Sequence, residues 1–151
     1  PSGIERIREY VGQARSFPTW MHAARALQEA HGASHPRFAI EDWLAMAKRC
    51  MVIQQNGRIG FDYDMAIAEP FRQADGAVPP DLWPAFDALK AVPLLIVRGA
   101  QSDLFSPETM NEMLARHGDA EGLTIADTGH APTLDEPDAV AAIDRLLDRA
   151  R

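Results

Sequence analysis

The sequence of 151 residues predicts an α/β protein in two parts, a mainly helical part over residues 1–80 and a strand–helix–strand–helix part over residues 81–151. In the first part, apolar side chains recur at three- and four-residue steps, which is the period of helices that bury one face. In the second part, short apolar runs alternate with helical patterns, which is the order of a parallel crossover unit.

Three helices are expected in the first part. The first covers residues 4–11, which place apolar side chains on one face before a glycine. The second begins after Thr19, whose hydroxyl can cap a helix, and ends at Gly32. The third covers residues 40–50.

A small antiparallel hairpin is expected after these helices. Asn56-Gly57 favours a tight turn and would join strands at residues 51–53 and 59–63. A short helix interrupted by proline is predicted over residues 64–74, and the Gly- and Pro-rich segment 76–84 is typical of a linker.

The second part begins with a short helical segment at residues 83–89 and a continuous apolar run at residues 93–100. Such a run is typical of a strand that is buried on both faces. Ser106 followed by Pro107 predicts the start of a helix, and Gly118 predicts its end.

A second strand over residues 123–127 and a last helix beginning at Pro137 complete the pattern. The spacing within this helix predicts one buried stripe, made of Val140, Ile143, Leu146 and Leu147.

The predicted sheet is incomplete as a stand-alone fold. Two parallel strands cannot by themselves cover the apolar run Leu94–Val97 or satisfy the hydrogen-bonding groups at their edges. No other strand of this type is predicted upstream. We therefore expect neighbouring strands from another polypeptide or from the rest of a longer protein, with self-association through exchanged strands as an alternative.

Composition and charge exclude several classes of function. The net charge is −7, and residues 76–151 hold 13 Asp and Glu against 6 Lys and Arg, so no basic surface for nucleic acid is expected. No apolar stretch approaches the ~20 residues that span a bilayer, and no signal-peptide pattern opens the sequence. The lone Cys50 cannot form an internal disulfide. We expect a cytoplasmic protein that binds neither nucleic acid nor membrane.

Asp103 and His130 follow the two predicted parallel strands, so they are expected at neighbouring strand ends. An aspartate within reach of a histidine fixes its tautomer and stabilises the imidazolium. The histidine can then act as a general base near neutral pH. Either residue alone is equally well explained as a turn or surface residue, but the pair at matching strand ends favours catalysis.

Two segments carry a family resemblance, V-P-L-L-I-V-R-G-A-Q-S-D at residues 92–103 and G-H-A-P-T-L-D-E-P at residues 129–137. With them, the second part resembles the C-terminal end of an α/β-hydrolase-fold protein. The resemblance implies that Asp103 is the acid of a catalytic triad and His130 its base. It also implies that residues 1–80 are a helical cap (lid) joined to the C-terminal portion of the hydrolase sheet.

The nucleophile of this family stands in a Gly-x-Ser-x-Gly turn, a pattern that occurs nowhere in this sequence. The resemblance therefore implies ester-type hydrolysis by a Ser-Asp-His triad whose nucleophile lies on a complementary N-terminal polypeptide. This chain alone is expected to be inactive. An Asp nucleophile, as in epoxide and haloalkane hydrolases, is one alternative, and a non-catalytic binding or interaction module is another.

The resemblance also implies a small apolar acyl-type substrate, because apolar residues adjoin the acid and the base and because caps cover the active site in this family. The candidates for contact with substrate are Leu104, Phe105, Ala131, Trp20 and Trp43.

No metal or cofactor is expected, because the remaining histidines share no metal-ligand spacing. These histidines are expected at the surface: His22, His31, His35 and His117. Cys50, at a helix end, is expected to be buried.

Overall fold

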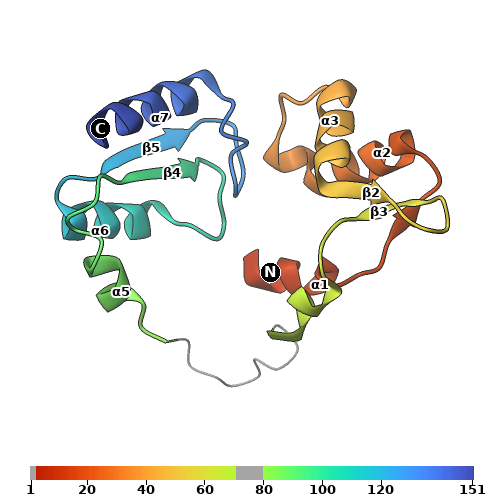
Figure 1. The fold of residues 1–151 in the computed structure, drawn as a ribbon, viewed down its shortest axis with the longest axis horizontal. Helices are drawn as coiled ribbons and strands as arrows, with labels where there is room; N and C mark the ends of the chain where they lie inside the picture. Colours follow the sequence, from red (N-terminus) through yellow and green to blue (C-terminus); the bar gives the residue numbers. More distant parts are fainter. Residues whose placement is uncertain (1–2, 71–79) are drawn as a thin grey trace. The chain divides into compact units, whose positions relative to one another are not determined.

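The chain divides into two units, Pro1–Ala77 and Val78–Arg151, which we describe separately. The structure is a computed structural model that describes residues 3–70 and 80–151 (Figure 1). Most of the predicted linker, and the end of the helix predicted over residues 64–74, lie outside the described residues.

The first unit contains a pair of helices, a small antiparallel sheet and shorter helical segments. Its elements are α1 (Gly3–Tyr10), β1 (Ser16–Phe17), α2 (Trp20–His31), η1 (Gly32–Ser34), α3 (Ile40–Cys50), β2 (Met51–Ile53), β3 (Ile59–Phe61) and η2 (Met65–Ala68).

The core of the first unit lies between α2 and α3, which pack against each other. Ala23 and Ala24 of α2 and Ala47 of α3 are fully buried, and their small side chains let the two helices approach closely. Trp43 is 1% exposed and fills the space beside them, with its ring against Phe38 at a centroid distance of 5.0 Å. The helical periodicity of the sequence therefore predicted this face correctly.

Side chains cap both helices of this pair. The Oγ1 atom of Thr19 accepts a hydrogen bond from the backbone N–H of His22 at 3.4 Å, as expected for a helix start. At α3 the carboxylate of Asp42 accepts from the backbone N–H of Ala39 at 2.8 Å. These bonds satisfy donors that a helix N-terminus leaves free.

The predicted hairpin is confirmed, with β2 antiparallel to β3 and Gly57 in the left-handed region at φ 76°. The strand β1, which pairs with the other edge of β3, was not predicted. A strand of two residues is too short to show the alternation of apolar and polar side chains that identifies a strand in a sequence. Arg58 holds this strand in place, since its guanidinium donates to the backbone carbonyl of Ser16 at 2.9 Å and to the Ser16 hydroxyl at 2.8 Å.

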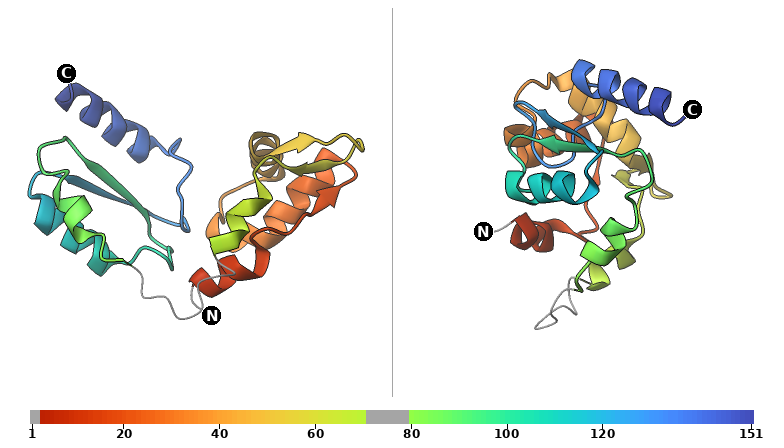
Figure 2. Two further views of the ribbon diagram at one scale, coloured as in Figure 1. Left: turned by 60° about the horizontal axis from the view of Figure 1, so that its bottom comes forward. Right: turned by 90° about the vertical axis from the view of Figure 1, so that its left-hand side faces the viewer.

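The second unit has the predicted strand–helix–strand–helix order. Its elements are α5 (Trp83–Asp87), β4 (Leu95–Gly99), α6 (Pro107–His117), β5 (Glu121–Ile125) and α7 (Pro137–Arg149). The two strands are parallel, and Figures 1 and 2 show α6 and α7 on opposite faces of the sheet. Leu94, Leu95 and Val97 are still only partly buried, which supports the expectation that this sheet needs further strands.

The predicted limits of α6 are confirmed in detail. Ser106 Oγ accepts from the backbone N–H of Thr109 at 3.1 Å, and Pro107 occupies the first turn. At the other end Gly118 takes a left-handed conformation, with φ 80°, and its N–H donates to the Leu114 carbonyl at 2.9 Å.

The predicted buried stripe of α7 is wrong in part. Val140 and Leu147 are 44% and 54% exposed, whereas Ala139 and Ala142 are fully buried. The helix is rotated so that these alanines face the described sheet, and a two-stranded sheet is too narrow to cover the wider apolar face. The strand β5 also begins and ends two residues earlier than the predicted range of 123–127.

His117 is buried, at 7% exposure, and the prediction of a surface position is wrong. Its Nε2 lies 3.1 Å from the carbonyl oxygens of both Leu89 and Val92, and its Nδ1 accepts from the N–H of Asp119 at 3.4 Å. The ring therefore ties the segment before β4 to the end of α6.

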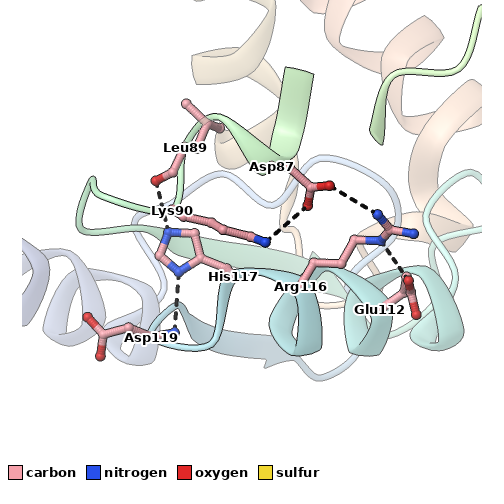
Figure 3. Close-up of polar contacts among 7 residues, drawn as sticks. All are labelled: Asp87, Leu89, Lys90, Glu112, Arg116, His117 and Asp119. Carbon is pink, nitrogen blue, oxygen red and sulfur yellow. Dashed lines mark hydrogen bonds and ion pairs between the residues drawn. The ribbon is translucent and has the colours of Figure 1, made fainter. Parts of the chain in front are cut away.

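A charged cluster joins α5 to α6 beside this histidine (Figure 3). The Arg116 guanidinium lies 3.3 Å from the Asp87 carboxylate and 2.6 Å from that of Glu112. The same guanidinium lies over the Trp83 ring, 4.4 Å from its centroid. These contacts explain why a helix of only five residues keeps its place.

Two further predictions on single side chains are corrected. His35 is partly buried, with its ring 4.8 Å from that of Phe38 and 5.8 Å from that of Trp43, instead of lying free at the surface. Cys50 was expected to be buried and is exposed. It lies at the junction of α3 and β2, on the side away from the core that Ala47 and Met51 fill.

Candidate active site

The candidate site lies where the parallel strands of the second unit end. Gly99 and Ile125 are paired in the last register position of β4 and β5. Residues 100–106, the acid loop, follow β4, and residues 126–136, the histidine loop, follow β5. The acid loop is bonded to the end of β5, from Ala100 N–H to the Ile125 carbonyl at 2.8 Å, and to the histidine loop, from Gln101 N–H to the Thr128 carbonyl at 2.9 Å.

Gly99 allows the two loops to meet. A Cβ atom at this position would lie 1.9 Å from the carbonyl oxygen of Gly129 and 2.6 Å from that of Thr128. Both obstacles are backbone atoms, so neither can move aside by a change of rotamer. Only glycine fits here, and the histidine loop crosses directly over the end of β4.

The crossing brings His130 onto the acid loop. The Oγ atom of Ser102 lies 3.1 Å from Nδ1 of His130. Asp103 is the next residue in the same loop, and both Asp103 and His130 are exposed. The acid and the base predicted from the sequence therefore lie on two loops that are in contact, on the same edge of one sheet.

Ser102 is held in place by the turn of the acid loop. Its Oγ accepts hydrogen bonds from the backbone N–H groups of Phe105 at 3.0 Å and Leu104 at 3.4 Å. A hydroxyl beside a histidine is one mark of an activated nucleophile. Here the oxygen already accepts two backbone N–H groups, and the arrangement is that of a turn cap that also touches His130.

Arg98, at the end of β4, forms hydrogen bonds to the backbone of the acid loop. Its side chain is 6% exposed. Its guanidinium donates to the carbonyl oxygens of Phe105 at 2.7 Å, Ala100 at 3.2 Å and Ser102 at 3.5 Å. One buried side chain thus bridges the two ends and the middle of the acid loop.

The histidine loop has an unusual backbone. Asp127, Ala131 and Leu134 have φ angles of 52°, 70° and 65°, in the left-handed region that residues other than glycine seldom occupy. Each such residue costs roughly 1–2 kcal/mol. Beyond His130, the N–H and hydroxyl of Thr133 both donate to the Glu136 carboxylate at 3.1 Å. The strained loop is therefore fixed at its far end.

Glu108 is the titratable group near this site whose pKa is perturbed. It lies in the first turn of α6, and a hydrogen bond from its own backbone N–H lowers the pKa of the carboxyl below its ordinary value. A hydrogen bond from Ser106 and the attraction of the Arg98 guanidinium act in the same direction. The first turn of α6 thus holds a carboxylate in the charged state next to the acid loop.

The residues predicted to contact substrate lie in both units. Leu104, Phe105 and Ala131 belong to the two contacting loops, where Phe105 is partly buried and the other two are exposed. Trp20 is partly buried against the core of the first unit. Trp43 belongs to that core itself, and at 1% exposure it has no face free for a ligand within its own unit.

Three residues of the candidate site were not predicted from the sequence: Gly99, Ser102 and Arg98. A signal for Arg98 was present, because a charged residue at the end of an apolar strand needs buried partners. The close approach at Gly99 has no counterpart in the sequence, because it depends on the path of a loop about thirty residues away. In the part of the chain that the structure describes, no cluster of His, Cys, Asp or Glu could hold a metal ion.

Comparison with known proteins supports the fold. The sequence profile described as "Alpha/beta hydrolase family" matches residues 4–143. The chain is 37% identical, over 93% of its length, to a 3-hydroxybutyrate-oligomer hydrolase of Cupriavidus necator. An alpha/beta hydrolase of Novosphingobium aromaticivorans of known structure is 57% identical and covers 97% of the chain with a TM-score of 0.88.

A Rickettsia typhi protein of known structure, at 20% identity, shares the fold over 98% of the chain with a TM-score of 0.77. The chain spans about half the length of these relatives, namely 50%, 52% and 49%. The structure also agrees with a partial α/β-hydrolase fold, with helices around a small parallel sheet. By profile, sequence and fold, this chain belongs to the alpha/beta hydrolase family.

Proposed function

We propose that the chain supplies the acid and the general base of an ester hydrolase, Asp103 and His130. The observation that carries this proposal is the contact between the two loops at the carboxyl ends of β4 and β5. Because β4 and β5 are parallel and paired in register, both loops lie at the same edge of the sheet, and this is the edge where ligands bind in open α/β sheets.

In this proposal, His130 removes the proton from a serine nucleophile and later donates it to the leaving alkoxide of the ester. In the assembled site Asp103 accepts a hydrogen bond from Nδ1–H of His130, the nitrogen that lies 3.1 Å from Ser102 Oγ in this structure, and its negative charge stabilises the imidazolium. The serine and the oxyanion hole lie outside the 151 residues, because the sequence holds no Gly-x-Ser-x-Gly turn. The chain alone is then inactive, and its partner is the polypeptide segment that carries the nucleophile.

The proposed substrate is an ester of a short apolar or hydroxylated acyl group. Leu104, Phe105 and Ala131 place apolar surface beside the proposed acid and base. The relative that is named as a 3-hydroxybutyrate-oligomer hydrolase supports a short hydroxy ester among the candidates. We assign no substrate contact to Trp43, which is used in the core of its own unit.

We further propose a cytoplasmic location for the protein. None of the helices in the described residues combines the length and apolar character needed to cross a bilayer. Cys50 is exposed and free, which suits a reducing compartment.

The test is hydrolysis of p-nitrophenyl butyrate and of a 3-hydroxybutyrate dimer by the full-length gene product. His130→Ala and Asp103→Asn are each expected to lower kcat by about 10³- to 10⁴-fold while the protein remains folded. Asp148→Asn, an exposed carboxyl in α7, serves as the matched control and is expected to leave kcat unchanged.

Full activity of either His130→Ala or Asp103→Asn would reject the proposed roles. Turnover of an epoxide or haloalkane, with no ester hydrolysis, would indicate that the nucleophile is an aspartate instead of a serine. No turnover of any of these substrates by the folded full-length protein would favour a binding module.

A further inference from the structure

We infer that Arg98 is the positioning residue of the acid loop: its buried guanidinium fixes the backbone that aims Asp103 at His130. This inference rests on the proposed function, since it names a residue that acts through the proposed acid. Arg98 belongs to the strand β4, and its side chain donates hydrogen bonds to backbone carbonyls of the acid loop.

The contacts of Arg98 are distributed along the acid loop. Its Nε donates to the carbonyl of Phe105 at 2.7 Å, two residues after Asp103. Its Nη2 donates to the carbonyls of Ala100 at 3.2 Å and Ser102 at 3.5 Å, before Asp103. The side chain of Asp103 therefore extends from a segment that is held on both sides by one rigid planar group.

The guanidinium is suited to this role by its shape. Arginine presents N–H donors in a fixed planar fork, so several carbonyl oxygens must converge on positions that the fork determines. Lysine carries the same charge on a flexible stem and cannot impose that geometry. Because Arg98 is only 6% exposed, little water is available to replace a lost donor, and each released carbonyl would have to move toward solvent.

The loop benefits from such a support because, in the described part of the chain, the backbone bonds to Ile125 and Thr128 hold only its first two residues, and its other backbone hydrogen bonds are local. They run from Ser102 N–H to the Gly99 carbonyl at 3.0 Å and from Phe105 N–H to Ser102 Oγ. Asp103 is exposed and cannot be held by burial. A catalytic carboxylate must be placed within a fraction of an ångström, and a misplacement of about 1 Å costs roughly 100-fold in rate.

The experiment is a double-mutant cycle in the full-length protein, with Arg98→Lys and Asp103→Asn measured singly and together. In the otherwise unaltered protein, Arg98→Lys is expected to lower kcat by about 10- to 100-fold and to change KM by less than about threefold. In the Asp103→Asn background, the same change is expected to lower the residual kcat by less than about threefold, because the group it positions is gone.

Arg145→Lys is the matched control. Arg145 lies in α7, its side chain is 55% exposed, and it pairs with Glu121 rather than with a loop. It is expected to leave kcat and KM unchanged in both backgrounds. Hydrogen exchange provides a second measurement, with faster exchange expected at the amides of residues 100–106 in Arg98→Lys and unchanged exchange in α7.

Additive effects of Arg98→Lys and Asp103→Asn on kcat would overturn the inference and leave the proposed function standing, and so would full activity of Arg98→Lys. Full activity of Asp103→Asn would instead overturn the proposed function. If Arg98→Lys does not fold, Arg98→Gln, which buries a neutral donor, takes its place in the same cycle with the same expected outcomes.

Discussion

Replacing Gly99 by alanine should both destabilise the second unit and impair the site. The added Cβ would lie 1.9 Å from the Gly129 carbonyl oxygen, whereas ordinary contact begins at 3.4 Å. The gap between these two distances, about 1.5 Å, must be met by moving the backbone of β4 or of the histidine loop. Forcing extra volume into a packed site costs typically about 1–3 kcal/mol of folding free energy.

The same movement displaces the residue that follows Gly129. With His130 as the proposed general base, a shift of about 1 Å in this group lowers the rate by roughly 100-fold, so Gly99→Ala should reduce kcat by about that factor in the full-length protein. The free energy of unfolding is measured by urea titration and kcat by ester hydrolysis, on the same preparation. KM should change little, because the displaced backbone adjoins His130 more closely than it adjoins the residues proposed to contact substrate.

The matched control is Gly122→Ala, in the partner strand. A Cβ there would lie 2.8 Å from the side-chain ends of Leu114 and Met110, which can rotate away. Gly122→Ala should lower the free energy of unfolding by less than about 1 kcal/mol. The cost of moving these side chains is partly offset, because alanine is more stable than glycine in a strand by a similar amount. Equal stability and equal kcat for Gly99→Ala and Gly122→Ala would refute the close approach as the reason for glycine at position 99.

Three further predictions concern the stability of the second unit. His117→Ala leaves the buried polar groups around this ring without their partner and should cost about 1–3 kcal/mol in a urea titration, whereas His22→Ala, at an exposed position, should cost little. Ser106→Ala removes the N-cap of α6 and should cost about 1 kcal/mol by the same measurement, and an unchanged midpoint would contradict the capping role. The hydrogen bond from Arg145 lowers the pKa of Glu121 below its ordinary value of 4.5, so the pair stabilises the fold above that pH and the contribution is lost as the pH falls through the lowered pKa. NMR titration should show this lowered pKa, and Arg145→Met should return it toward 4.5.

The sequence was most informative where one residue type has one physical role. Ser106, Pro107 and Gly118 mark the limits of α6 because each satisfies or removes a backbone group at a helix end. Asn56-Gly57 marks the hairpin because Gly57 adopts a positive φ. These local rules do not depend on the rest of the fold, so the residues alone are enough to apply them.

The sequence was least informative where distant segments decide the outcome. His117 is buried because the carbonyls of Leu89 and Val92 converge on its ring, which no pattern in the sequence indicates. Val140 was expected to be buried on helical periodicity, and its exposure depends on the width of the sheet that α7 covers. Periodicity predicts an apolar face but not which part of it finds a partner.

The candidate site was predicted in part for the same reason. Asp103 and His130 could be placed at one sheet edge because parallel strands bring their carboxyl ends together. Two other residues hold the loops in place. Arg98 binds the backbone of the acid loop, and Gly99 leaves room for the backbone of the histidine loop. Both depend on the paths that the loops take, which no local pattern of residues indicates.

Covalent labelling of the full-length protein by diethyl p-nitrophenyl phosphate, mapped by mass spectrometry, tests the proposed division of the active site most directly. A serine nucleophile attacks phosphorus, releases p-nitrophenolate and keeps the diethylphosphoryl group. We expect one labelled serine in a Gly-x-Ser-x-Gly turn outside these 151 residues, with labelling lost in His130→Ala. A label on Ser102 or on another serine within this sequence, or labelling that persists in His130→Ala, would contradict the proposal.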